Sequence, residues 1–118
     1  MLSPTVLAEI ERLGGVATRD ATIFDVAWPK GVTYRTTCDD RADREVLWAE
    51  LGGRRDAGQD HTAFGTSNNG KVLICISKTD TSADPMVFLA PEKSAIVPSQ
   101  PLSIFLGSLE REPTRKRR

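Results

Sequence analysis

The chain has 118 residues, of which 39% are hydrophobic, and its 16 basic and 16 acidic side chains give a formal net charge of zero. This length suits one domain with its own core, and the apolar share is that of an ordinary soluble protein. No apolar run approaches the ~20 residues that a membrane span needs, so we expect no membrane-spanning helix.

The N-terminus contains neither a basic leader nor a long apolar run, so we expect no secretory signal and a cytoplasmic location. Two cysteines, Cys38 and Cys75, are too few for a disulfide framework or a zinc site, which fits that location. Residues 110–118 hold five basic and two acidic side chains, whereas residues 1–109 carry a net charge of −3. We predict one domain over residues 1–109 and a disordered basic tail over residues 110–118.

Local signals predict a helix and then a hairpin in the N-terminal part. Ser3 can cap a helix that begins at Pro4, and Gly14-Gly15 can end it. Residues 22–28 are β-formers, and residues 32–38 alternate between apolar and polar side chains after a Pro-Lys-Gly turn. This pattern predicts two antiparallel strands with one solvated face.

The following segment favours a second helix and then a connection. Asp39, Asp40 and Asp43 supply a cap and negative charge ahead of residues 44–51, where three large apolar side chains share one side before a Gly-Gly pair. We therefore expect a short helix over residues 44–51. Residues 54–60 are polar and are expected to form a surface loop.

The C-terminal half is richest in strand signals. Residues 62–65 and 71–77 flank Asn69-Gly70, which is the commonest dipeptide of a tight hairpin. An apolar run at residues 86–90 predicts a further strand, and residues 95–97 a short fourth one. Connections of this length imply antiparallel pairing, because parallel strands need long crossovers.

Residues 72–76 are apolar on both faces, so we expect them to form the central strand. A final helix should begin near Pro101, with four apolar side chains on one face: Leu102, Phe105, Leu106 and Leu109. The order of elements predicts an α+β fold, in which an antiparallel sheet of about four to six strands carries helices mainly on one face.

The glycine-rich segment from Gly65 to Lys71 has the spacing of a phosphate-binding loop up to its lysine. The match fails at Val72, which stands where a hydroxyl should bind magnesium, and a strand follows where the phosphate site needs a helix. A calcium loop is excluded because the segment contains no carboxylate. The segment is best explained as a hairpin turn.

Candidate catalytic groups are few. His61 is the only histidine, and with Asp60 beside it it could act as an oriented base in a hydrolase or transferase. Cys75 lies in an apolar strand, and Cys38 is followed by two aspartates that oppose thiolate formation. We interpret these residues as structural and predict a non-catalytic protein without cofactor or metal.

Residues 61–109 resemble the SMI1/KNR4 (SUKH) superfamily, through a Gly-x-Ser-x-x-Gly hairpin, a strand at residues 85–89 and a final Ser-x-Phe-Leu helix. The matching residues are Gly65, Ser67 and Gly70 in the hairpin, and Ser103, Phe105 and Leu106 in the helix. Many bacterial members of this superfamily are immunity proteins that bind and neutralise a toxin, commonly a nuclease. The resemblance implies the same role here, with a protein toxin as partner. We expect a monomer or homodimer.

A toxin inhibitor needs a surface that covers an active site, and acidic side chains can steer it towards a basic site such as that of a nuclease. The candidate partner-binding residues are Asp39, Asp40, Asp43, Trp48, Glu50, Asp56 and Asp60. Trp48 would be the aromatic anchor. Two alternatives stay open: the acids are merely solvated and Trp48 belongs to the core, or the chain is an adaptor that self-associates through a sheet edge or a helix. No direct contact with nucleic acid or membrane is expected.

Overall fold

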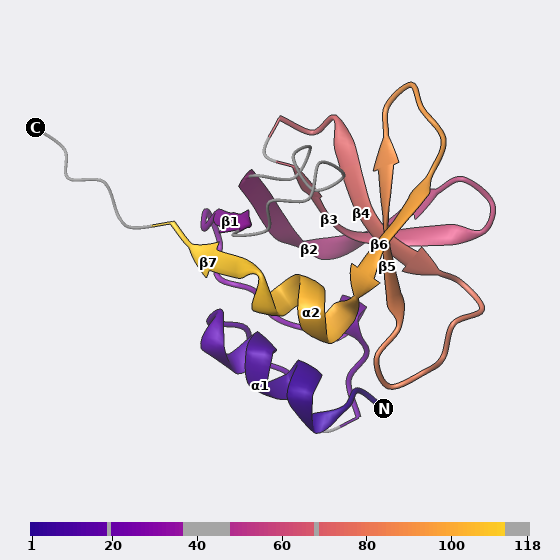
Figure 1. Cartoon of the computed structure of the whole chain (residues 1–118). Coiled ribbons are helices and arrows are strands. Elements are labelled where there is room, and N and C mark those ends of the chain that lie inside the picture. The colour runs from indigo at the N-terminus through magenta and orange to yellow at the C-terminus, as the bar shows by residue number, and fades with distance from the viewer. Residues whose placement is uncertain (19, 37–47, 68, 113–118) are drawn as a thin grey trace, which may run out of the picture.

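The computed structural model describes residues 1–18, 20–36, 48–67 and 69–112, and within them one antiparallel sheet of seven strands carries two short α-helices (Figure 1). The strand order is β6-β5-β4-β3-β2-β1-β7. The elements in chain order are α1 (Pro4–Arg12), the 3-10 helix η1 (Ile23–Asp25), β1 (Tyr34–Thr36), β2 (Trp48–Ala57), β3 (His61–Ser67), β4 (Val72–Ser77), β5 (Met86–Pro91), β6 (Val97–Pro101), α2 (Leu102–Gly107) and β7 (Leu109–Arg111). The antiparallel sheet is as predicted, but it has more than the expected four to six strands and dominates the fold.

The C-terminal half follows the prediction most closely. β3 and β4 form an antiparallel hairpin, with Gly70 at a positive φ of 75° and the Asn69 side chain accepting a hydrogen bond from the Lys71 amide at 3.0 Å. β4 is an interior strand beside the central β3, and β5 pairs with it. The short strand lies later than predicted, at β6, and α2 ends at Gly107, so Leu109 is buried as the first residue of β7.

A bulge in β3 decides which side chains enter the core. The register between β3 and β4 shifts between Ala63 and Gly65, and the extra residue, Phe64, is fully buried in the main core. Gly65 lies against β2: a Cβ at this position would sit 2.7 Å from the carbonyl oxygen of Glu50. A glycine is therefore required here by close approach of two strands.

Residues 22–28 do not form the predicted strand. Thr22 and Asp25 form a reciprocal capping box around η1, in which the Phe24 amide donates to the Thr22 hydroxyl and the Thr22 amide to the Asp25 carboxylate. This local hydrogen bonding stabilises a 3-10 turn in spite of the β-forming side chains. Only an isolated bridge between Val16 and Ala27 has strand character.

The predicted hairpin of residues 22–28 and 32–38 is also wrong. β1 pairs instead with β2 and with β7, which lies about 75 positions further along the chain. The Glu112 amide donates to the Thr33 carbonyl at 3.0 Å, so ordered backbone continues past the boundary predicted at residue 109. Cys38 and the predicted tail from residue 113 onward lie outside the described residues.

The helix predicted over residues 44–51 is wrong for residues 48–51, which belong to a strand; residues 44–47 lie outside the described residues. Trp48 and Leu51 belong to β2, with Leu51 packed against the main core and Trp48 on the opposite face. Gly52 and Gly53 have positive φ values of 132° and 83°, so they form an irregularity within the strand and not a helix end. β2 then continues to Ala57, through half of the loop predicted at residues 54–60.

Both α-helices pack on the same side of the sheet (Figure 1), as predicted. The main core lies between them and the inner face of the sheet. It includes Val6, Ile10 and Leu13 from the N-terminal segment, Leu102, Phe105 and Leu106 from α2, and Phe64, Ile74, Val87 and Leu89 from the strands. No helix in the described part of the chain is long and apolar enough to cross a membrane.

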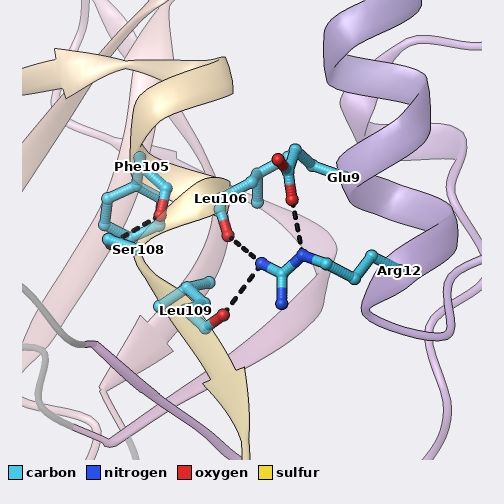
Figure 2. Close-up of polar contacts among 6 residues, drawn as sticks. All are labelled: Glu9, Arg12, Phe105, Leu106, Ser108 and Leu109. Atoms are coloured by element: carbon cyan, nitrogen blue, oxygen red, sulfur yellow. Dashed lines mark hydrogen bonds and ion pairs between the residues drawn. The ribbon is translucent and has the colours of Figure 1, made fainter.

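Arg12 joins the two helices at their ends (Figure 2). Its guanidinium donates to the carbonyl oxygens of Leu106 and Leu109, both at 2.9 Å, and to the Glu9 carboxylate at 2.6 Å. The carbonyl groups at the end of a short helix lack partners of their own, and a cation there also complements the helix dipole. Arg12 thereby fixes α1 against the junction of α2 and β7.

We expect Arg12→Ala to lower the free energy of unfolding by about 1–2 kcal/mol, because it leaves carbonyl groups at the end of α2 without their charged donor. Arg12→Lys should recover only part of this loss, since a lysine cannot span both carbonyls with a planar fork. Urea denaturation of the three proteins checks this. Equal stability of the alanine and wild-type proteins would contradict the clamp.

Candidate functional site

The face of the sheet opposite the helices, here called the outer face, carries a second and smaller group of apolar side chains. Ala57, Ala63 and Cys75 are buried on it, and Leu73, Phe88 and Ala90 pack around them half-buried. These side chains share a face because Ala63 pairs with Cys75, and Cys75 pairs with Phe88, directly across the strands. Neither α-helix covers them.

A hollow of about 380 Å³ lies on this face, here called the outer hollow. Its walls come from the end of β2, the start of β4, and the end of β5 with the loop that follows. The lining residues are Arg55, Asp56, Ala57, Gly58, Gly70, Lys71, Leu73, Ala90, Pro91, Glu92 and Ile96. The floor is apolar, whereas the rim is charged.

The charges on the rim differ in their partners. Asp56 forms an ion pair with Lys78, 3.3 Å between carboxylate oxygen and ammonium nitrogen. Arg55, Lys71 and Glu92 are exposed, and the described residues contain no ion pair that involves them. The hollow therefore presents two free cations and one free anion above an apolar floor.

His61 also lies on the outer face, next to Phe88. Its ring meets the Phe88 ring edge-to-face, with 4.7 Å between the centroids. This contact gives His61 a structural role, as an aromatic ring that packs against Phe88. Asp60 is exposed in the turn before β3, where its carbonyl oxygen accepts a hydrogen bond from the Lys78 amide.

Cys75 is fully buried beneath the outer face, and its thiol donates to the Phe88 carbonyl at 3.5 Å. Burial raises the pKa of this thiol to about 11, from an ordinary value of 9.0. The thiol is therefore protonated at neutral pH and is a small apolar side chain in the sheet, not a nucleophile.

The structure describes four of the predicted partner-binding residues, Trp48, Glu50, Asp56 and Asp60, and they lie towards the two ends of β2. Asp39, Asp40 and Asp43 lie outside the described residues. Glu50 and Asp56 are both exposed on β2 but six positions apart, roughly 20 Å at the rise of a strand. Glu50 is therefore separate from Asp56 and Asp60, which both contact Lys78.

Trp48 lies on the outer face and not in the main core. It pairs with Arg35 across β1 and β2, and the Arg35 guanidinium carbon lies 5.9 Å from the centre of its ring. The indole is half-buried. Of the predicted site residues that the structure describes, Trp48 and Glu50 lie on the face that carries the outer hollow, and Asp56 is in the lining of the hollow itself.

A second hollow, of about 340 Å³, lies on the inner side of the sheet between η1 and the ends of β2 and β4. Arg54 forms one wall and stacks on Phe24, 4.4 Å from guanidinium carbon to ring centroid, while Lys78 pairs with Asp56 opposite. Asp80 also lines it, but its carboxylate accepts hydrogen bonds from the Ser82 amide and hydroxyl, which lower its pKa. The charges in this hollow are thus satisfied within the chain.

Sequence reasoning did not single out Arg55, Lys71, Leu73 or Ile96. The sequence did contain a signal for Leu73, because residues 72–76 are apolar on both faces and only one face can pack on the helices.

Within the described ranges, no group of three or more His, Cys, Asp and Glu residues could hold a metal ion. No family model, no curated protein and no solved structure matches this chain.

Proposed function

We propose that this chain is a non-catalytic immunity protein of the bacterial cytoplasm, which binds a cognate protein toxin through the outer face of its sheet and covers the toxin's active site. The observation that carries the proposal is the outer face itself. It combines buried Ala63 and Cys75, half-buried Leu73 and Phe88, and a charged rim. Apolar surface with a polar rim is what a protein interface requires.

Trp48 extends this face towards β1 and offers a large aromatic side chain beside the cation of Arg35. Tryptophan and arginine are the residue types that most often dominate the binding energy of an interface. The resemblance of residues 61–109 to the SMI1/KNR4 superfamily is the second support, since it implies an inhibitor of a toxin. A nuclease is one class of toxin that it suggests.

Self-association through a sheet edge is less favoured. The edge strand β6 contains Pro98 and Pro101, which cannot donate to an added strand, and the opposite edge strand β7 has only three residues. An adaptor would therefore have to use the same outer face or a helix. The two functions differ in whether a toxin is neutralised.

A growth assay tests the proposal. Each gene adjacent to this one is expressed alone and then together with this protein, and relief of toxicity identifies the partner. His61→Phe should retain protection, because it keeps an aromatic ring against Phe88 and the proposed role needs no base, whereas an enzyme that uses His61 with Asp60 would lose it. Toxicity that persists under verified expression of both proteins would refute the immunity role for those neighbours.

A further inference from the structure

The outer hollow has an electrostatic preference that its apolar floor alone does not reveal. Arg55 and Lys71 stand on its rim without ion pairs among the described residues, and Glu92 is the only free carboxylate on the same rim. Asp56 also lines the hollow, but its charge is offset by Lys78 at 3.3 Å. When Lys78 is counted beside Asp56, these side chains sum to a net charge of +1, which favours an anion.

The positions of the two cations strengthen this preference. Arg55 lies opposite Ala63 in the sheet, and Lys71 directly precedes the first residue of β4. They thus approach the hollow from different strands, with the half-buried side chain of Leu73 also in its lining.

We propose that the outer hollow receives a segment of the toxin that combines an apolar side chain with a carboxylate. The apolar side chain rests on Leu73, Ala90 and Ile96, and the carboxylate binds Arg55 and Lys71. This deepens the proposed function and rests on it for the identity of the partner. It differs from the sequence expectation, in which acidic side chains of this chain meet a basic toxin site, because Arg55 and Lys71 line the hollow.

The chain offers a matched control for each cation. Arg54 is adjacent to Arg55 but lies in the inner hollow against Phe24, and the exposed Lys30 lines neither of the two hollows. Arg55→Glu with Lys71→Glu reverses the outer charges. Arg54→Glu with Lys30→Glu, called the inner double variant after Arg54, makes the same change in net charge away from the outer hollow, so non-specific charge effects cancel in the comparison.

The first test needs no toxin. The probe is 8-anilinonaphthalene-1-sulfonate, an apolar anion, and its uncharged counterpart N-phenyl-1-naphthylamine lacks only the sulfonate. We expect the sulfonate to bind one-to-one and to shift the amide resonances of Lys71, Leu73 and Ala90. The outer double variant should weaken this binding about tenfold, as expected when charge-assisted contacts are removed, while the inner double variant and the neutral dye change little.

Circular dichroism of both variants, and the milder pair Arg55→Gln with Lys71→Gln, separate lost binding from lost folding. Failure of the sulfonate to bind, equal binding of the neutral dye, or equal weakening by the inner variant would each overturn the proposed chemistry of the hollow.

The second test uses a toxin identified by the growth assay. The outer double variant should lose protection and the inner one should keep it. If both protect, the hollow is not the site, although the immunity role stands. If wild-type protein relieves no toxicity, the immunity role fails, and the dye experiment still reports on the hollow.

Discussion

Replacement of Phe64 by alanine should lower the free energy of unfolding by about 3–5 kcal/mol, the usual cost of truncating a buried phenylalanine. The bulge between Ala63 and Gly65 directs this ring into the main core, where it is fully buried. Its removal leaves a cavity between the sheet and the helices that the close packing of β2 on Gly65 prevents from collapsing. Guanidinium denaturation measures the loss.

Phe88→Ala is the matched control, because it truncates the same side chain on the outer face. Phe88 is only half-buried, and we expect its loss to cost about 1–2 kcal/mol, in proportion to the smaller area removed from water. The slope of the denaturation curve should stay unchanged in both variants, since the same surface unfolds. An equal cost at the two positions would mean that Phe64 is not the core residue described here.

The C-terminal half could be predicted because its signals are local. Asn69-Gly70 marks the β3–β4 turn, and the run at residues 72–76 marks an interior strand. α1 is equally local: the Ser3 hydroxyl accepts a hydrogen bond from the Val6 amide at 3.1 Å, as its capping position predicts. In these elements short-range chemistry decides the backbone and the sequence patterns were sufficient, whereas the capping box of Thr22 and Asp25 is equally local and was missed.

The remainder depends on partners that are distant in the chain. The pairing of β1 with β7 has no local signal, because a three-residue strand becomes stable only when its neighbours are in place. β2 was predicted as a helix in part because Trp48 and Leu51 are spaced by three positions, which puts apolar side chains on one helical side. In the strand these two residues lie on opposite faces instead. Leu51 packs against the main core, and the Trp48 ring lies beneath the Arg35 guanidinium.

The candidate site was missed for a related reason. Charge counting favoured the acids that cluster in the sequence, but a binding surface depends on which side chains the fold brings together. Arg55 and Lys71 are 16 positions apart in the sequence and meet on one rim only because β2, β3 and β4 are adjacent. The unbroken apolar run along β4 predicted a strand buried on both faces. The outer face is that second face, and a partner protein is its proposed cover.

The buried thiol of Cys75 predicts a loss of stability in alkaline solution. The thiol of the unfolded chain ionises near its ordinary pKa of 9.0, whereas burial raises the pKa in the folded protein to about 11. Between these values the folded state holds the proton more tightly, so the unfolded state binds fewer protons and stability falls as the pH rises. The contribution is fully present below pH 9 and should decline by on the order of 2–3 kcal/mol by pH 11.

Urea denaturation under reducing conditions, repeated from pH 8 to pH 11, measures this dependence. Cys75→Ala removes the titrating group and should flatten the curve between pH 9 and 10. Above that range Tyr34 adds a second loss in both proteins, because burial also raises the pKa of its hydroxyl, which donates to the Leu13 carbonyl at 2.6 Å. Identical slopes for the two proteins between pH 9 and 10 would show that the thiol is open to solvent, and with it that the outer face is looser than its packing around Ala63 and Phe88 indicates.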